Sequence, residues 1–278
     1  MIDKHQIAAN FSKAASTYDE YAFVQREIGD RLFERLDLMK IKPECIVDIG
    51  CGTGWFTRKL KKRFSRARVC GVDIAPGMLT QAKNHNGWFG KCQYELADMD
   101  RLPFSDQSVD LLFSNLSLQW SLDLKKTMTE FSRVLKPSGL LLFSTLGPDT
   151  LQELKLAFSR VDQRQHVNDF LDMHHVGDAM LSSGLYQPVM DREALTFEYE
   201  TVKGILKDLK GIGANSLNGG RSTGLMSKGQ WQSLVKAYDA IKASQSSYPV
   251  TYEALFGHAW GAQASAAVAS DTYPISLS

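Results

Sequence analysis

A glycine-rich loop offers the clearest chemistry in the sequence. Residues 47–54 read Val-Asp-Ile-Gly-Cys-Gly-Thr-Gly, so an apolar run leads directly into three alternating glycines. Glycine lets the backbone turn sharply and approach a ligand that a Cβ atom would exclude. The spacing is G-x-G-x-G after Asp48, and it matches neither the dinucleotide loop G-x-G-x-x-G nor a P-loop. Gly50, Gly52 and Gly54 therefore form a candidate ligand cradle, although a plain tight turn would use the same residues.

Two further aspartates follow later apolar runs. Asp73 ends the second run, where a carboxylate can accept hydrogen bonds from both hydroxyls of a ribose. Asp98 follows the third run, where an acidic side chain can accept from an adenine amine. Ligands of open α/β sheets lie at the carboxyl ends of the strands. Each aspartate alone could be a surface residue, but together with the loop they predict a site for a nucleoside.

The elements that must position these residues alternate along the chain. Nearly apolar strands are expected at residues 45–49, 68–72, 92–97, 109–114 and 140–146, with a turn at 137–139. Helical periodicity covers residues 24–36 and 124–135, and helices are also expected after Thr53 and from Pro76. This alternation predicts a parallel sheet covered on both faces. The predicted class is therefore α/β, a doubly wound, Rossmann-like, mostly parallel sheet of seven strands.

The C-terminal half follows a different pattern. Apolar and polar residues alternate at 195–200 and again at 250–256, which predicts an antiparallel hairpin at one sheet edge. Two helical stretches, 202–209 and 231–241, and a glycine-rich segment, 211–224, interrupt this hairpin and suggest a substrate cap. We expect one domain over residues 1–261, comprising an N-terminal helical lid (1–40), a core (41–200), a helical cap insertion (201–247) and a last strand (248–261). Residues 262–278 are expected to form a flexible tail.

Composition narrows the possible partners and location. The formal net charge is +1, so no overall field favours nucleic acid or a membrane. The chain lacks the residue order of a signal peptide and has no apolar run of about 20 residues, so a cytoplasmic protein is predicted. Four cysteines without a C-x-x-C pair indicate reduced, packed thiols. His174 and His175 have no cysteine or acidic cluster near them, and no metal is predicted.

Four segments together resemble the motif series of class I S-adenosylmethionine-dependent methyltransferases. They are residues 48–54, 71–73, 97–104 and 135–139. The resemblance implies that Asp48 and the three glycines lie at the methionine part of the cofactor and that Asp73 holds its ribose. It also implies that Asp98 and Met99 flank the adenine and that Asn115 begins the loop near the methyl group.

The flanking segments resemble a narrower group, the malonyl-acyl-carrier-protein O-methyltransferases of biotin synthesis (the BioC family). The matching segments are residues 10–19, 172–178, 208–215, 220–225, 248–253 and 257–260. The resemblance implies methylation of the free carboxylate of a malonyl thioester, which primes pimelate synthesis, with acyl carrier protein as partner. A carboxylate is ionised at neutral pH, so no general base is needed and catalysis would rest on positioning.

The sequence gives several candidates, and no single one, for the residues that would bind the malonyl group. Arg221 is a candidate partner for the carboxylate, with Arg160, Arg164 and Arg192 as alternatives. Tyr18 could close over the cofactor, and Gln119 and Trp120 could line the methyl pocket. A basic run between residues 58 and 68, or the lysines of the cap, could bind the acidic carrier, although such runs are usually solvated surface. Two other functions remain open: methylation of another small carboxylic acid, and a methyltransferase-like assembly factor for respiratory complexes.

Overall fold

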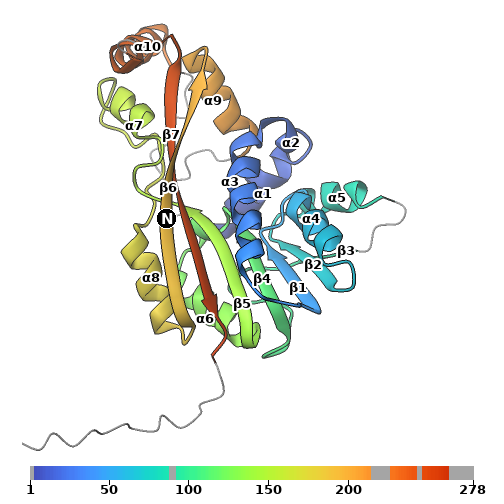
Figure 1. Ribbon diagram of the computed structural model, residues 1–278. Helices are drawn as coiled ribbons and strands as arrows, with labels where there is room; N and C mark the ends of the chain where they lie inside the picture. The colour runs from blue at the N-terminus through green and yellow to red at the C-terminus, as the bar shows by residue number, and fades with distance from the viewer. Residues whose placement is uncertain (1–2, 88–91, 214–225, 243–245, 263–278) are drawn as a thin grey trace, which may run out of the picture.

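A seven-stranded sheet organises the protein (Figure 1). The computed structural model describes residues 3–87, 92–213, 226–242 and 246–262. The strand order is β3-β2-β1-β4-β5-β7-β6, in which β7 runs antiparallel to both neighbours and the other pairs are parallel. The strands are β1 (Cys45–Ile49), β2 (Arg68–Asp73), β3 (Cys92–Leu96), β4 (Val109–Asn115), β5 (Leu135–Leu146), β6 (Tyr186–Tyr199) and β7 (Tyr248–Trp260).

Helices cover both faces of the sheet, as the apolar strands require. In β4, Leu111 and Phe113 belong to one buried cluster, whereas Leu112 between them belongs to another, because side chains alternate along a strand. The first cluster packs under α3 (Phe23–Glu34), α4 (Trp55–Arg63) and α7 (Gln152–Ser159); the second packs under α6 (Leu124–Val134) and α8 (Met173–Ser182). The doubly wound arrangement is thus confirmed.

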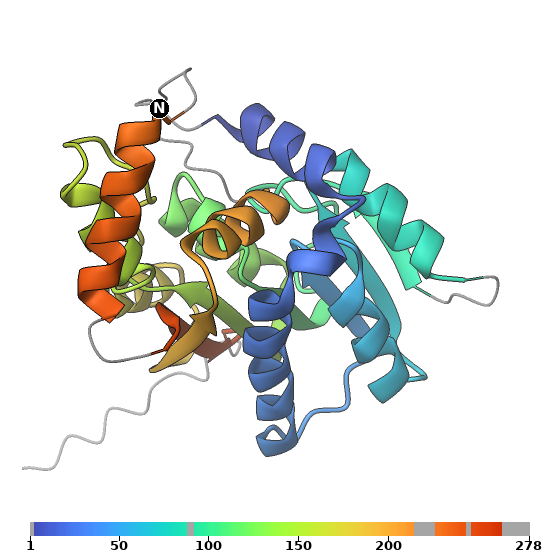
Figure 2. The ribbon, with the colours of Figure 1, turned by 90° about the horizontal axis from the view of Figure 1, so that it is seen from above.

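The N-terminal segment reaches the carboxyl ends of the strands. It begins with α1 (Lys4–Ala14) and α2 (Tyr18–Tyr21), ahead of α3. Figure 2 shows α1 lying beside α5 (Pro76–His85), and the hydroxyl oxygen of Ser12 accepts a hydrogen bond from the backbone N–H of Gly77 at 3.1 Å. After α3 the chain forms a short 3-10 helix, η1 (Arg35–Leu38), and a second one, η2 (Leu118–Trp120), follows β4.

The insertion between β6 and β7 contains the expected helices. They are α9 (Val202–Gly211) and α10 (Lys228–Lys242). Tyr199 and Tyr248 are paired, so the insertion leaves and re-enters the sheet at adjacent positions. The buried Tyr238 of α10 donates its hydroxyl to the carbonyl of Pro249 in β7 at 2.8 Å, which ties this helix to the ribbon. Most of the glycine-rich segment and the expected tail lie outside the described residues.

Several boundaries differ from the sequence prediction. Strand β6 begins at Tyr186 and β7 ends at Trp260, so both are longer than the expected 195–200 and 250–256. The turn expected at residues 137–139 lies inside β5, because the pairing shifts from Val109–Leu135 to Leu111–Leu140 and the extra residues form a bulge. Ser138 has a φ of 60° there, and its N–H still donates to the carbonyl of Gly261. The helix expected over residues 24–36 ends at Glu34 and continues as η1.

The four cysteines are free thiols, as predicted. Among the described residues, no helix combines the length and apolar character needed to cross a bilayer.

Candidate active site

A cavity lies where β1, β2, β3 and β4 end. The strand-end aspartates Asp73 and Asp98 both line it, together with Gly50 and Gly52 of the loop and Asn115 at the end of β4. Its other lining residues are Lys4, Ile7, Phe11, Tyr18, Ile49, Val72, Ile74, Met78, Ala97, Met99, Leu116, Ser117 and Trp120. Of the residues that the sequence suggests for a cofactor, all but Asp48 and Gly54 line this one hollow, which we call the first cavity.

The glycine loop takes the conformation that only glycine adopts easily. Gly50, Gly52 and Gly54 have φ values of 68°, 54° and 76°. A Cβ on Gly50 would lie 2.3 Å from the Cβ of Ser117, whereas one on Gly52 would meet only the Tyr18 ring, at 4.0 Å. Gly52 therefore keeps space open in the cavity, as a ligand cradle requires.

Gly54 has a different role from the other two glycines. It does not line the first cavity, and a Cβ there would lie 2.6 Å from the hydroxyl of Tyr94 and 3.1 Å from the Cβ of Ala82. Its position instead lets α4 start close to β3 and α5. The third glycine of the motif is therefore a packing residue, not a ligand contact, in this structure.

Asp73 is held rigidly at the end of β2. Its Oδ2 accepts from the N–H of Gly52 at 2.9 Å and its Oδ1 accepts from the N–H of Ala75 at 2.8 Å. Burial raises the pKa of this carboxyl, and the backbone hydrogen bonds oppose that rise. Each oxygen keeps a second lone pair, so the fixed carboxylate can accept from two neighbouring hydroxyls of a ligand in the cavity.

Asp98 forms an ion pair with a lysine near the N-terminus. Lys4 of α1 donates to Oδ1 and Oδ2 of Asp98 at 2.7 and 2.6 Å and to Asp100 at 2.6 Å. Burial lowers the pKa of Lys4, but the hydrogen bonds to Asp100 and Asp98 outweigh it and raise the pKa. These ion pairs hold α1 against the first cavity.

Asp48 is buried beneath the loop. Its Oδ2 accepts from the hydroxyl of Thr57 at 2.6 Å, and burial raises the pKa of the carboxyl to about 7. Asp48 lines a small third cavity with Gly50, Gly52 and Asn115, all three of which also line the first cavity. Tyr18 lines both.

A second, largely apolar cavity shares a wall with the first. Phe11, Tyr18, Leu116 and Trp120 line both, and the Phe11 and Trp120 rings pack edge to face with centroids 5.3 Å apart. Gln119 lines the second cavity only, with its amide donating to the carbonyl of Leu116. Further lining comes from Val24, Gln25, Leu146, Thr150, Leu151, Leu154, Phe158, His166, Val167, Asn168, Phe170, Leu206, Leu209, Lys210, Ile212 and Tyr252.

The charge of the second cavity suits an anion. Among the described residues that line it, none is acidic and Lys210 of the cap helix carries the positive charge. His166 also lines it; its ring stacks on Phe158 with centroids 3.9 Å apart, and its Nε2 pairs with Asp162 at 2.7 Å. The cavity can therefore accept a carboxylate without facing a like charge.

The three candidate arginines that the structure describes are not brought to these cavities. Arg221 lies outside the described residues. Arg192 is on β6, where it pairs with Glu253 at 3.1 Å, and neither Arg160 nor Arg164 lines the first or second cavity. Among the described residues that line the second cavity, Lys210 is the lysine or arginine that could bind the carboxylate in their place.

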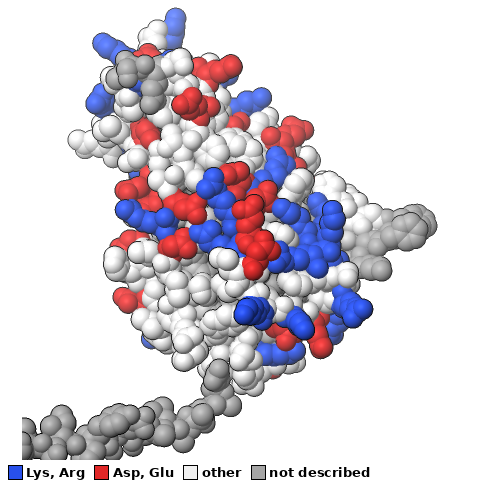
Figure 3. Space-filling view, in the orientation of Figure 1, with Lys and Arg blue, Asp and Glu red and all other residues white. Residues whose placement is uncertain are grey.

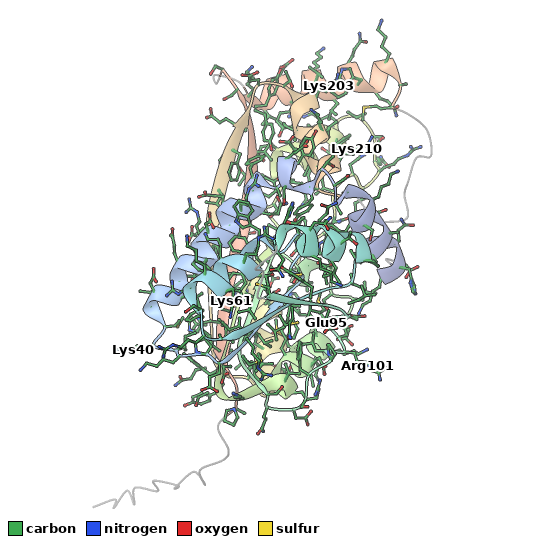
Figure 4. All side chains as sticks on the ribbon, turned by 90° about the vertical axis from the view of Figure 1, so that its right-hand side faces the viewer. Lys40, Lys61, Glu95, Arg101, Lys203 and Lys210 are labelled. Atoms are coloured by element: carbon green, nitrogen blue, oxygen red, sulfur yellow. The ribbon has the colours of Figure 1, made fainter. Side chains whose placement is uncertain are left out.

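The basic run on α4 is largely engaged within the protein. Lys59 pairs with Asp30 and Arg63 with Asp37, at 2.6 and 2.7 Å, and Lys61 donates to the carbonyls of Ser65 and Ala67. On the face shown in Figure 3, acidic and basic side chains lie side by side. Figure 4 places Lys61 well away from Lys203 and Lys210 of α9. The α4 run is therefore a solvated, paired face in this structure.

Adjacent histidines prove to be part of a helix cap. Asp172 accepts from the N–H groups of His174 and His175, and the His175 ring pairs with its other oxygen at 2.9 Å. The His174 side chain is 88% exposed, with its Nδ1 3.9 Å from Asp172 Oδ1.

The residues that sequence reasoning missed come mainly from α1 and from the residues after each strand. Lys4, Ile7 and Phe11 are spaced by three or four along one helix face, which is the available signal for a helix that covers a site. Ile74 directly follows Asp73 and also lines the first cavity.

Comparison with known proteins agrees with this geometry. The family described as "Methyltransferase domain" matches residues 47–143. Among solved structures, the YcgJ protein from Bacillus subtilis superposes with a TM-score of 0.59 at 17% identity, covering 84% of this chain and 98% of its own. The phosphoethanolamine N-methyltransferase 2 of Haemonchus contortus, in complex with S-adenosylhomocysteine, gives 0.57 at 20% identity, over 91% of this chain and 58% of its own.

The fold and the cavity at its strand ends therefore define an S-adenosylmethionine-dependent methyltransferase. Two relatives named malonyl-[acyl-carrier protein] O-methyltransferase match nearly the whole chain. The one from Gallionella capsiferriformans is 46% identical over 94% of this chain and 91% of its own length, and the one from Nitrosospira multiformis is 42% identical over 93% and 89%. This chain belongs to the malonyl-[acyl-carrier protein] O-methyltransferase family.

Proposed function

We propose that this enzyme transfers the methyl group of S-adenosylmethionine to the free carboxylate of a malonyl group carried as a thioester on acyl carrier protein. The observation that carries the proposal is the shared wall of the first and second cavities, in a chain of this family. A ligand in one cavity meets a ligand in the other at Phe11, Tyr18, Leu116 and Trp120. The methyl ester so formed would prime pimelate synthesis for biotin.

The first cavity fits the cofactor, which supplies a methyl group on a positively charged sulfur. In our assignment Asp73 accepts from the ribose hydroxyls, and Asp98 and Met99 flank the adenine. The loop glycines Gly50 and Gly52 give the methionine part room to approach the backbone. Asp48 lies beneath the loop at the methionine end of the cofactor, and Asn115 lies between the cofactor and the acceptor. Gly54 allows α4 to begin close to Tyr94 and Ala82.

The second cavity receives the acceptor. A carboxylate is already ionised at neutral pH, so the oxygen attacks without a general base. Tyr18, Gln119 and Trp120 orient it toward the methyl group, and the apolar lining removes water from the reacting oxygen. Catalysis then rests on alignment, as expected from the sequence.

The cap is the region to which we assign the carrier protein. Lys203, Lys207 and Lys210 fall at positions i, i+4 and i+7 of α9 and so share one helix face. An acidic carrier placed there would present its thioester arm to the cavity that Lys210 lines. Arg221 remains a candidate contact in the same insertion. The single-domain organisation, with lid, core, cap and last strand, and the cytoplasmic location remain predictions.

Mass measurement of the product tests the proposal. Purified protein is incubated with S-adenosylmethionine and malonyl-acyl carrier protein, with malonyl-coenzyme A and acetyl-acyl carrier protein as controls. A gain of one methyl group on the malonyl carrier, and none on the acetyl carrier, is expected because the free carboxylate is the target. Equal transfer to malonyl-coenzyme A would contradict recognition of the carrier. If no methyl group is transferred to either malonyl thioester, the proposal that malonyl is the acceptor is wrong.

A further inference from the structure

Gln25 of α3 stands at the junction of two cavities. It lines the second cavity, where the acceptor is placed, and also the third cavity beside the glycine loop. Tyr18 is the other residue that lines both of these cavities. Gln25 is thus placed between the methionine end of the cofactor and the acceptor.

The backbone of Gln25 is fixed in this position. Its carbonyl accepts from the side-chain amide of Asn115 at 2.9 Å, and the Asn115 oxygen accepts from the hydroxyl of Ser144 at 2.7 Å. One turn later, a Cβ on Gly29 would lie 2.2 Å from the Phe56 ring and 2.7 Å from the Asn115 amide, so α3 approaches the end of β4 as closely as glycine allows. These contacts anchor the helix that carries Gln25.

The side-chain oxygen of Gln25 lacks a partner in the described part of the protein. Oε1 is buried and forms no hydrogen bond there. Leaving a buried amide oxygen unpaired is costly, so native structures seldom do so unless a water molecule or a ligand completes the site. The nearest place for such a ligand is the cavity pair that this side chain separates.

A neutral amide suits this junction better than a charged group. A glutamine oxygen accepts hydrogen bonds, and its NH2 group donates two. The methionine part of the cofactor has, beside its own carboxylate, an ammonium group, which donates, and the malonyl acceptor ends in a carboxylate, which accepts. A carboxylate at position 25 would attract the first and repel the second, and a lysine would do the reverse.

We propose that Gln25 contacts both reactants: its Oε1 accepts from the cofactor ammonium while its NH2 group donates to the malonyl carboxylate. This inference rests on the proposed function, since it takes the acceptor to be a malonyl thioester. Gln25 would then be a specificity-determining residue that fixes the position of the malonyl carboxylate relative to the cofactor. Neither the glycine motif nor the strand-end pattern indicated it.

Gln25→Glu and Gln25→Met separate the two contacts. In Gln25→Glu the KM for malonyl-acyl carrier protein should rise at least tenfold because of charge repulsion, while the Kd for S-adenosylmethionine, measured by calorimetry, stays within threefold. Gln25→Met keeps the side-chain length without hydrogen bonds, so both constants should rise, each by roughly three- to tenfold. Glu27→Gln is the matched control on the same helix, because Glu27 pairs with Arg31 at the surface, and both constants should stay unchanged.

The outcomes keep the two proposals apart. Unchanged KM for malonyl-acyl carrier protein in both Gln25 variants, with wild-type transfer intact, would overturn the role of Gln25 alone. Absence of transfer by the wild-type enzyme would end the proposed function and this inference with it. Should Gln25→Glu not fold, as judged by thermal unfolding, Gln25→Met and Gln25→Asn still decide the question.

Discussion

Lys4 and Asp98 are 94 residues apart in the sequence, yet the lysine Nζ lies 2.7 and 2.6 Å from the two carboxylate oxygens. Lys4 also meets the nearly buried Asp100 at 2.6 Å. The first turn of α1 is thereby attached to the loop after β3, across the first cavity. Because α1 contributes Ile7 and Phe11 to the lining, we expect its attachment to control access to the first cavity.

Lys4→Met should loosen this attachment. Hydrogen bonds to charged groups contribute about 1.5–3 kcal/mol, and partial exposure favours the lower end here. We therefore expect roughly tenfold weaker S-adenosylmethionine binding, mostly through faster dissociation, in stopped-flow fluorescence. Lys13→Met, at the exposed last turn of the same helix, is the control and should bind as the wild type does. Equal dissociation rates in all three proteins would show that α1 does not gate the cavity.

Asp73→Asn should weaken cofactor binding more than folding. An asparagine keeps the shape, but its NH2 group cannot accept from a ribose hydroxyl or from the N–H of Gly52 or Ala75. A loss of about 1.5–3 kcal/mol corresponds to roughly 10- to 100-fold in Kd, measurable by calorimetry. A Kd within threefold of the wild type would remove Asp73 from the ribose site.

Gly52→Ala should mainly lower cofactor affinity, whereas Gly54→Ala should mainly lower the stability of the fold. Both place a side chain at positive φ, at about 1–3 kcal/mol each. At position 54 the methyl group would also collide with Tyr94, so the main loss should appear as a lower free energy of unfolding. At position 52 the methyl group points into open space beside Tyr18, so cofactor affinity should fall at least tenfold. The reverse pattern would contradict the distinction between cradle and packing glycine.

Asp48 should give the folded protein a pH-dependent stability in the absence of cofactor. Burial raises the pKa of its carboxyl to about 7, so the protonated form is favoured in the folded state. This contribution to stability is complete below about pH 4 and disappears as the pH rises through 7. Linkage gives a loss of about 2–3 kcal/mol between pH 5 and 8. Asp48→Asn should remove that part of the decline in urea unfolding; an identical pH profile in both proteins would refute the assignment.

Sequence reasoning predicted the parts of the fold that depend on local pattern. The strands β1 and β2 were correct because each is largely apolar; β3 lies where it was expected although it is half polar and Tyr94 is its one buried residue. The interrupted hairpin was also correct, since the alternation of β6 and β7 is visible on both sides of the insertion. The bulge at Ser138 could not be found in this way, because Pro-Ser-Gly has the composition of an ordinary turn.

What the sequence could not provide was contact between distant segments. Nothing near Lys4 indicates that it meets Asp98, and nothing near Gln25 places it between two cavities. The glycine motif likewise gave no reason to separate Gly54 from Gly52, because the difference lies in Tyr94 and Ala82, which belong to other elements. Such roles follow from the packing of α1 and α3, not from residue spacing.

The pairing of Tyr199 with Tyr248 has a consequence for how such enzymes diversify. The cap leaves the sheet and returns to it through neighbouring backbone positions, so its length and sequence can change without moving either strand. A short turn at the same place would close β6 and β7 as an ordinary hairpin and leave the glycine loop and Asp73 untouched. The ribbon is thus a grafting point, at which evolution or an engineer can exchange the cap while the sheet that carries the glycine loop is inherited unchanged.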